Sequence, residues 1–290
     1  MELFINLAIN GIAMGMLIFL IASGLTLIFG LMSVLNFAHG GLFAWGAYSG
    51  VFFYVLLDNF WLGLLGAIVT GLLLGWLTEV LIVRPVYGNH IRQILITLGF
   101  MLVLTEMLKV VFGPNIINAP TPEMFQGSWM IGDITIIKYR AFIIAVGLIL
   151  FIVMYSVLKY SKIGLIVRAG VMNKDMIQAL GVNIKLVFVL VFMVGSALAA
   201  LGGALFAPSS GAIYAEMGLE FGIFAFIVVI IGGMGSIPGS LLAALLVGLA
   251  NTFTAYYMPI LSMVVTMIIM LIVLIFRPQG LFNVSGVSNK

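Results

Sequence analysis

Charged residues are scarce in this sequence, and cysteine is absent. Only 7% of the 290 residues are charged, whereas 64% are hydrophobic, and the mean hydropathy is +1.32. A soluble domain carries about 25% charged residues, so this composition excludes that class. The lack of cysteine excludes disulfides, thiolate metal sites and redox couples. The sequence therefore predicts a protein that lies within a lipid bilayer and has no large soluble domain.

Motifs for enzyme chemistry are missing as well. A phosphate-binding loop needs Gly-Lys followed by Ser or Thr, and this combination occurs nowhere in the chain. The two histidines, His39 and His90, are far apart in the sequence, which argues against a zinc site. No Ser/His/Asp set and no pair of carboxylates for a common pocket emerges. We expect no enzyme activity, no metal, no nucleic-acid binding and no cofactor bound by this chain.

Long apolar runs are what the sequence has instead, and a bilayer crossing takes about 20 helical residues. The runs lie at roughly 5–32, 39–57, 61–83, 93–112, 139–158, 186–207, 221–232, 240–256 and 259–276. Seven of them are full spans, and the runs 221–232 and 240–256 are short. We predict an all-α, polytopic helical membrane protein with about eight to ten transmembrane or half-length helices in one domain over residues 1–290.

Basic residues indicate the orientation of the chain. The segment 159–185 holds five Lys or Arg residues against one acid, so the positive-inside rule places it in the cytoplasm. Counting spans puts the loop 84–92 and the C-terminus on the same side, and the N-terminus outside. Residues 110–137 contain acids and prolines but no basic residue, which is typical of an external loop.

The cytoplasmic segment contains the signature of a short helix at about 174–180. Asn173 is suited to cap its start, Asp175 lies in the first turn, and Gly181 fits the position just past its end. An apolar ridge along this helix is rimmed by charge. Such a helix either inserts into a groove of a partner protein or lies among the lipid headgroups.

Two polar or glycine-rich interruptions are candidate pathway elements. One is Asn36-Phe37-Ala38-His39-Gly40-Gly41, and the other is the glycine cluster at 232–240. The alternatives are helix capping or packing for the first and a tight cytoplasmic turn for the second. The candidate pathway residues are Asn36, His39, Gly40, Gly41, Gly233, Gly235 and Ser236.

Other polar and small residues in the runs have a structural interpretation. Glu106 and Lys109 are three residues apart and can neutralise each other, and Glu79 lies close to Arg84. The pairs Gly11-x-x-x-Gly15 and Gly71-x-x-x-Gly75 are typical of close helix contacts.

Four local motifs together carry a family resemblance. They are Leu35-Asn36-Phe37-Ala38-His39-Gly40-Gly41-Leu42-Phe43, the segment from Arg168-Ala169 to Leu180-Gly181-Val182-Asn183, Gly232-Gly233-Met234-Gly235-Ser236, and Arg277-Pro278-Gln279-Gly280-Leu281-Phe282. With them, nearly the whole chain resembles the LivH-type permease subunit of high-affinity branched-chain amino-acid ABC importers. One departure is that ABC importer permeases often carry Glu-Ala-Ala before a glycine, where this chain has Arg168-Ala169-Gly170.

The resemblance implies a function in which this chain is the conduit and other subunits supply the energy. The expected partners are a second permease subunit (identical or a paralogue), two cytoplasmic ATPase subunits that use ATP, and an external substrate-binding protein, all at the bacterial cytoplasmic membrane. Segment 159–185 would couple to the ATPase through Arg168, Asn173, Lys174, Asp175, Ile177 and Gly181. The expected substrates are leucine, isoleucine and valine.

Two alternatives share these features. Related permeases for urea, short amides or sugars use the same scaffold. A channel that conducts a small neutral solute without ATP would also have polar breaks at membrane depth.

Overall fold

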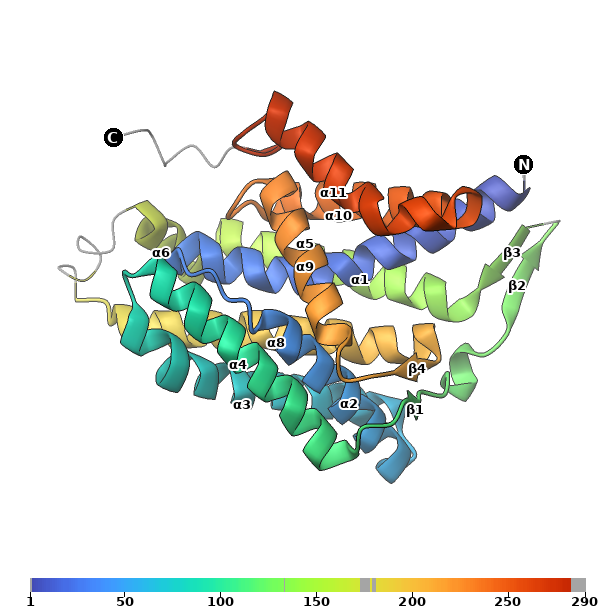
Figure 1. The fold of residues 1–290 in the computed structure, drawn as a ribbon, viewed down its shortest axis with the longest axis horizontal. Coiled ribbons are helices and arrows are strands. Elements are labelled where there is room, and N and C mark those ends of the chain that lie inside the picture. Colours follow the sequence, from blue (N-terminus) through green and yellow to red (C-terminus); the bar gives the residue numbers. More distant parts are fainter. Residues whose placement is uncertain (1, 133, 173–177, 179–180, 283–290) are drawn as a thin grey trace.

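The chain folds into a bundle of helices that mostly run along its longest axis (Figure 1). The structure is a computed structural model that describes residues 2–132, 134–172, 178 and 181–282. Its helices are α1 (Glu2–Met32), α2 (His39–Leu57), α3 (Phe60–Leu77), α4 (His90–Phe112), α5 (Lys138–Tyr160), α6 (Lys162–Met172), α8 (Ile184–Ser210), α9 (Met217–Gly232), α10 (Ile237–Tyr257) and α11 (Pro259–Phe276). The predicted all-α, polytopic fold is confirmed.

Shorter elements complete the chain. A π-helical turn η1 (Thr78–Val83) and a 3-10 turn η2 (Arg84–Val86) extend α3, and a further 3-10 turn η3 is Glu123–Phe125. The strands are β1 (Ile117–Asn118), β2 (Ser128–Ile131), β3 (Ile134–Ile137) and β4 (Ala212–Ile213).

The helix bounds agree with the apolar runs to within a few residues. In the described part of the chain, seven helices are long and apolar enough to cross a bilayer. They include α10, whose run was expected to be short, whereas α9 and the apolar stretch Val264–Phe276 of α11 are shorter. Asparagine side chains define several of the starts. Asn59, Asn89 and Asn183 accept hydrogen bonds from backbone N–H groups in the first turns of α3, α4 and α8.

Helix α1 occupies the centre of the bundle, where it packs against α8, α9 and α10 (Figure 1). Residues 16–25 are all buried. Gly15 of α1 contacts the backbone of Gly248 in α10, and Gly71 and Gly75 of α3 contact α8. Because lipid gives no hydrophobic drive for helix association, small residues that allow close van der Waals packing hold such helices together. The predicted helix contacts at these glycines are confirmed.

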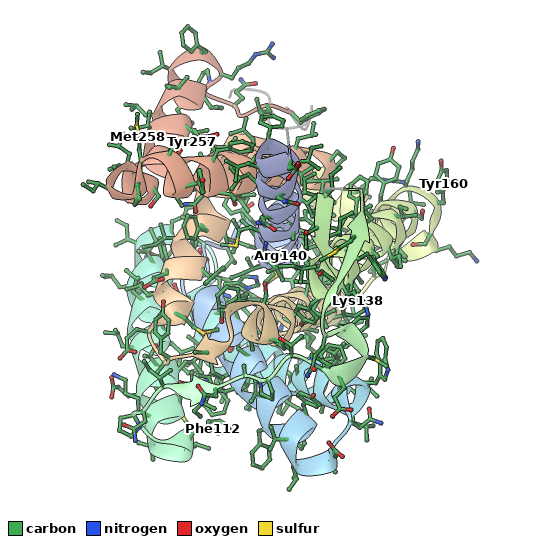
Figure 2. The ribbon with its side chains drawn as sticks, turned by 90° about the vertical axis from the view of Figure 1, so that its right-hand side faces the viewer. Phe112, Lys138, Arg140, Tyr160, Tyr257 and Met258 are labelled. Atoms are coloured by element: carbon green, nitrogen blue, oxygen red, sulfur yellow. The ribbon has the colours of Figure 1, made fainter. Side chains whose placement is uncertain are left out.

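The two ends of the bundle carry different loops (Figure 1). The basic end bears the turn 84–89, helix α6 and residues 277–282, and the hairpin end bears the N-terminus and strands β2 and β3. Figure 2 looks onto the hairpin end, where Arg140 near the start of α5 donates a hydrogen bond to Asn10 of α1. The loops that the sequence assigned to one side of the membrane therefore lie together.

The segment 159–185 contains more helix than the sequence indicated. Residues before about 173 were expected to be loop-like, but α6 forms there. The Ser161 hydroxyl accepts a hydrogen bond from the backbone N–H of Gly164, which caps the helix start. Val167 is buried in a cluster with side chains of α1 and α8. Tertiary packing thus stabilises an eleven-residue helix that would be marginal by itself.

The expected external loop contains short strands. Strands β2 and β3 pair antiparallel with Ile131 opposite Ile134, and β1 pairs with β4 with Ile117 opposite Ile213. The apolar residues around Gly132-Asp133 are a recognisable hairpin signal that the prediction missed. The pairing of β1 with β4 joins segments far apart in the sequence, so no local pattern indicates it.

We expect Gly46→Ala to destabilise the protein, because a Cβ at Gly46 of α2 would collide with the backbone of Ala200 in α8. Overpacking of this kind costs about 1–3 kcal/mol. Gly99→Ala is the matched control, since Gly99 is also helical and a Cβ there meets nothing within 4 Å. Thermal unfolding of the purified protein in detergent measures the difference, and equal stability of the two variants would contradict the packing.

Candidate pathway site

The break between α1 and α2 reaches into the interior of the bundle. Helix α1 ends at Met32, and Ser33 has a positive φ of 54°. Residues 33–38 then run back along α1, because the His39 Nε2 atom lies 3.0 Å from the carbonyl oxygen of Ile21. Ile21 precedes the end of α1 by about 16 Å at 1.5 Å per residue. Helix α2 therefore begins at the middle of the bundle.

The polar side chains of this break are buried with unused hydrogen-bonding capacity. Asn36 and His39 are fully buried. Within the described part of the chain, neither polar atom of the Asn36 side chain has a partner, and His39 Nδ1 has none. The backbone is satisfied in part by Thr97 of α4, whose hydroxyl accepts a hydrogen bond of 3.2 Å from the Phe37 N–H. Buried polar groups without partners are costly, so each of them needs an explanation such as a bound water or solute.

Gly40 and Gly41 allow two other helices to approach this break. A Cβ at Gly40 would collide with the backbone of Gly218 and Gly222 in α9, and one at Gly41 would contact Leu104 of α4. The sequence left open whether this region serves helix packing or a pathway. The structure shows that these glycines pack helices around a buried polar break.

A hollow of about 270 Å³ lies beside the break, between α4 and α9. Ligand pockets start at about 300 Å³, so this hollow suits a small solute. Its walls are apolar, and they include Phe37, whose ring stacks on Phe226 with 4.3 Å between centroids. We call it the apolar groove, and its lining residues are Phe37, Leu98, Gly218, Leu219, Gly222, Ile223, Phe226, Ile227 and Ile230.

An ion cluster joins α4 to the start of α9 toward the hairpin end. Lys109 Nζ lies 2.9 Å from a carboxylate oxygen of Glu106, which confirms the predicted pair, and 2.8 Å from one of Glu216. The hydrogen bond from Lys109 lowers the pKa of Glu216, which lies in the loop before α9. The part played by Glu216 was missed, because it follows Lys109 by more than a hundred residues.

The second predicted interruption lies elsewhere. Gly233, Gly235 and Ser236 form the turn between α9 and α10 at the basic end, where Gly235 contacts Gly30 of α1. Gly233 and Gly235 have φ values of +96° and +91°, and the Ser236 hydroxyl caps α10 by accepting a hydrogen bond from the Gly239 N–H. Of the two alternatives left open by the sequence, the structure has the tight turn. The two sets of candidate pathway residues lie on different connections, one between α1 and α2 and the other between α9 and α10.

Comparison with known proteins identifies the family. The model of the family described as "Branched-chain amino acid transport system / permease component" matches residues 7–274. The chain belongs to this family. It is a multi-pass membrane protein and a transport permease by family, as the four motifs indicated.

Relatives and one solved structure resemble this permease over most of its length. It is 29% identical to the high-affinity branched-chain amino acid transport system permease protein LivH of Escherichia coli K12, over 97% of this chain and 96% of that one. The identity to BraD of Pseudomonas aeruginosa is also 29%, over 95% and 94% of the two chains. LivM of E. coli K12 is 29% identical, over 92% of this chain and 68% of LivM.

The structure of PsaBC from Streptococcus pneumoniae in complex with Fab has a similar fold. The TM-score is 0.51 at 14% identity, and the match covers 93% of the permease and 91% of the solved chain.

Most residues expected to couple the permease to an ATPase lie outside the described residues. These are Asn173, Lys174, Asp175 and Ile177. Arg168 is described, and its guanidinium donates hydrogen bonds to the carbonyl oxygens of Leu158 and Lys159 at the end of α5. Gly181 has a φ of +85°, the left-handed conformation expected just past a helix end.

A buried acid at the basic end of the permease is neutralised locally. Glu79 is fully buried in η1, and its carboxylate lies 2.7 Å from Arg84 Nη2, which confirms the predicted proximity. The Tyr87 hydroxyl donates a further hydrogen bond to Glu79. Burial, followed by this hydrogen bond, raises the pKa of Tyr87. No three His, Asp or Glu side chains among the described residues gather in a way that would hold a metal ion.

We expect Thr97→Val to impair the site while it preserves the shape of the side chain. Thr97 is fully buried, and valine would leave the Phe37 N–H without its acceptor, at a cost of about 1–3 kcal/mol. Thr97→Ser retains the hydroxyl and is the matched control. Thermal unfolding in detergent, together with solute uptake, measures the effect. A Val variant as stable and as active as the Ser variant would show that this hydrogen bond is unimportant.

Proposed function

We propose that this chain is the membrane-spanning subunit of an ABC importer that carries leucine, isoleucine and valine across the bacterial cytoplasmic membrane. The observation that carries the proposal, beyond the family, is the apolar groove next to a buried polar break. A branched-chain amino acid has the same two parts: an aliphatic side chain and a pair of charged backbone groups.

The groove favours an aliphatic side chain over the polar solutes that related permeases carry. Its walls include Leu219, Ile223 and Ile227 of α9, which would bury a branched side chain at about 25 cal/mol per Å² of apolar surface. Urea, short amides and sugars would lose hydrogen bonds to water there without replacement. The unpartnered amide of Asn36 and the start of α2, where the helix dipole favours an anion, are suited to the amino-acid carboxylate.

The charge distribution supports an orientation with the basic end in the cytoplasm. Of the twelve Lys and Arg residues, Lys109, Lys138 and Arg140 belong to the hairpin end. The other nine belong to the loop 84–92, the segment 159–185 and the tail. By the positive-inside rule, the C-terminus is cytoplasmic and the N-terminus is external.

Separate subunits supply the energy and the substrate in this proposal. Two ATPase subunits bind and hydrolyse ATP. They contact the segment 159–185 of this chain, which forms a single permease domain. A second permease subunit completes the conduit, and an external binding protein delivers the solute. The relatives named LivH and LivM, both from E. coli K12, favour a paralogue as the second permease.

We expect Ile223→Trp to reduce leucine uptake by the complete transporter, because the larger ring would fill the groove. One methylene in a hydrophobic pocket already changes discrimination by about 10–200-fold, so a loss of about tenfold or more is expected. Leu102→Trp is the control, since Leu102 is exposed on α4 and does not line the groove. Uptake of labelled leucine, isoleucine, valine, urea, acetamide and a hexose is measured in parallel.

Two outcomes would contradict the proposal. If urea, acetamide or the hexose enters and leucine does not, the substrate class is wrong. If liposomes that contain this chain alone conduct any of these solutes without ATPase subunits, the protein is a channel instead.

A further inference from the structure

The residues that follow α11 fold back onto the end of α9. The Leu281 N–H donates a hydrogen bond of 2.8 Å to the carbonyl oxygen of Ile231, and the Phe282 N–H donates one of 3.2 Å to that of Gly232. The last carbonyls of a helix have no partner within the helix. Here the tail supplies two of those partners. We call residues 277–282 the tail latch.

Two glycines make the contact a direct one between backbones. A Cβ at Gly280 would lie 2.6 Å from the Cα of Gly233, and a Cβ at Gly233 would collide with the carbonyl oxygen of Phe282. Gly280 and Gly233 have φ values of +81° and +96°, a backbone conformation that residues with a Cβ atom rarely adopt. Gly280 is buried. The motif Arg-Pro-Gln-Gly-Leu-Phe thus has a defined position against the Gly-Gly motif, although the two are far apart in the sequence.

Helix α9 connects this contact to the apolar groove. Ile230 precedes the hydrogen-bonded residues directly, and Phe226 and Ile227 lie about one turn earlier, and all three line the groove. The same end of α9 contacts α10, where a Cβ at Gly232 would meet the backbone of Gly239. A rigid helix of 16 residues transmits any displacement of this end to the groove wall.

We propose that the tail latch is a positioning element for transport: it fixes the cytoplasmic end of α9, and latch and helix move as one body. Its residues act through Phe226, Ile227 and Ile230 and do not contact the solute. This inference rests on the proposed function, because it assigns the groove wall a role in passage of the substrate.

Glycine substitutions on both sides of the contact test the latch. Gly280→Ala and Gly233→Ala are each expected to lower the leucine uptake rate of the complete transporter in proteoliposomes by about tenfold, while ATP hydrolysis continues. Gly88→Ala is the matched control, because Gly88 also has a φ of +81° at the basic end but a Cβ there meets nothing within 4 Å. It carries the same backbone strain without the collision and should transport like the wild type.

The double variant separates a shared contact from two independent defects. Since both substitutions open the same latch, the double variant should lose no more uptake than the stronger single variant. Additive losses, a fall in ATP hydrolysis in step with uptake, or a Gly280→Ala variant that behaves like Gly88→Ala would overturn the proposal.

A disulfide cross-link between the tail latch and α9 tests the proposal if the alanine variants do not reach the membrane. The chain has no cysteine, so Ile231→Cys with Leu281→Cys places the only two thiols on residues joined by a backbone hydrogen bond. The oxidised protein should transport at the wild-type rate, because latch and α9 move together. Loss of uptake that a reductant restores would show that the latch must open, and would overturn the proposal.

If the wild-type transporter takes up another solute of the panel and not leucine, the proposed substrate has failed. The latch is then tested with that solute in the same variants.

Discussion

Direct contact between helix backbones is the constraint on which the rest of this structure depends. In a bilayer, lipid tails are as apolar as leucine, so helices gain nothing by hiding apolar surface and must associate through close packing. The contacts of Gly15 with Gly248 and of Gly24 with Gly195 bring α10 and α8 onto the central helix α1. Each contact requires a small residue on both helices, so the residue type at one position constrains the residue type at a position far away in the sequence.

Close packing also accounts for a polar break in the interior. The chain leaves α1 at Met32 and returns to the level of Ile21 before α2 starts, so residues 33–38 cross the interior without forming a helix. Non-helical backbone at this depth is tolerated only where protein or water satisfies it. The Thr97 hydroxyl accepts one of the backbone hydrogen bonds of this segment. The glycines at the start of α2 allow neighbouring helices to pack closely over it. The side chain of Asn36 remains buried there without a hydrogen-bond partner among the described residues.

Features that depend on the lipid environment or on local spacing could be predicted from the sequence, whereas contacts between distant segments could not. The spans were predictable because a run of about 20 apolar residues has few alternatives to a transmembrane helix. The ion pair of Glu106 with Lys109 was predictable because both residues lie on one helix face. Glu216, the third member of that cluster, was not, and the apolar groove was not, because α4 and α9 meet only in the folded chain. The tail motif was recognisable by resemblance, but nothing local indicates that it contacts Gly233.

Helix α9 is held by close backbone contacts near both of its ends. Near its start, Gly218 and Gly222 pack against the backbone of Gly40 in α2, and Glu216 in the preceding loop pairs with Lys109 of α4. Its end is fixed by backbone hydrogen bonds to the tail and by a glycine contact with α10 that admits no side chain. The groove wall, which is formed by residues of this helix, therefore lies between two close backbone contacts. The close contacts at its two ends join this wall to α2 on one side and to α10 and the tail on the other.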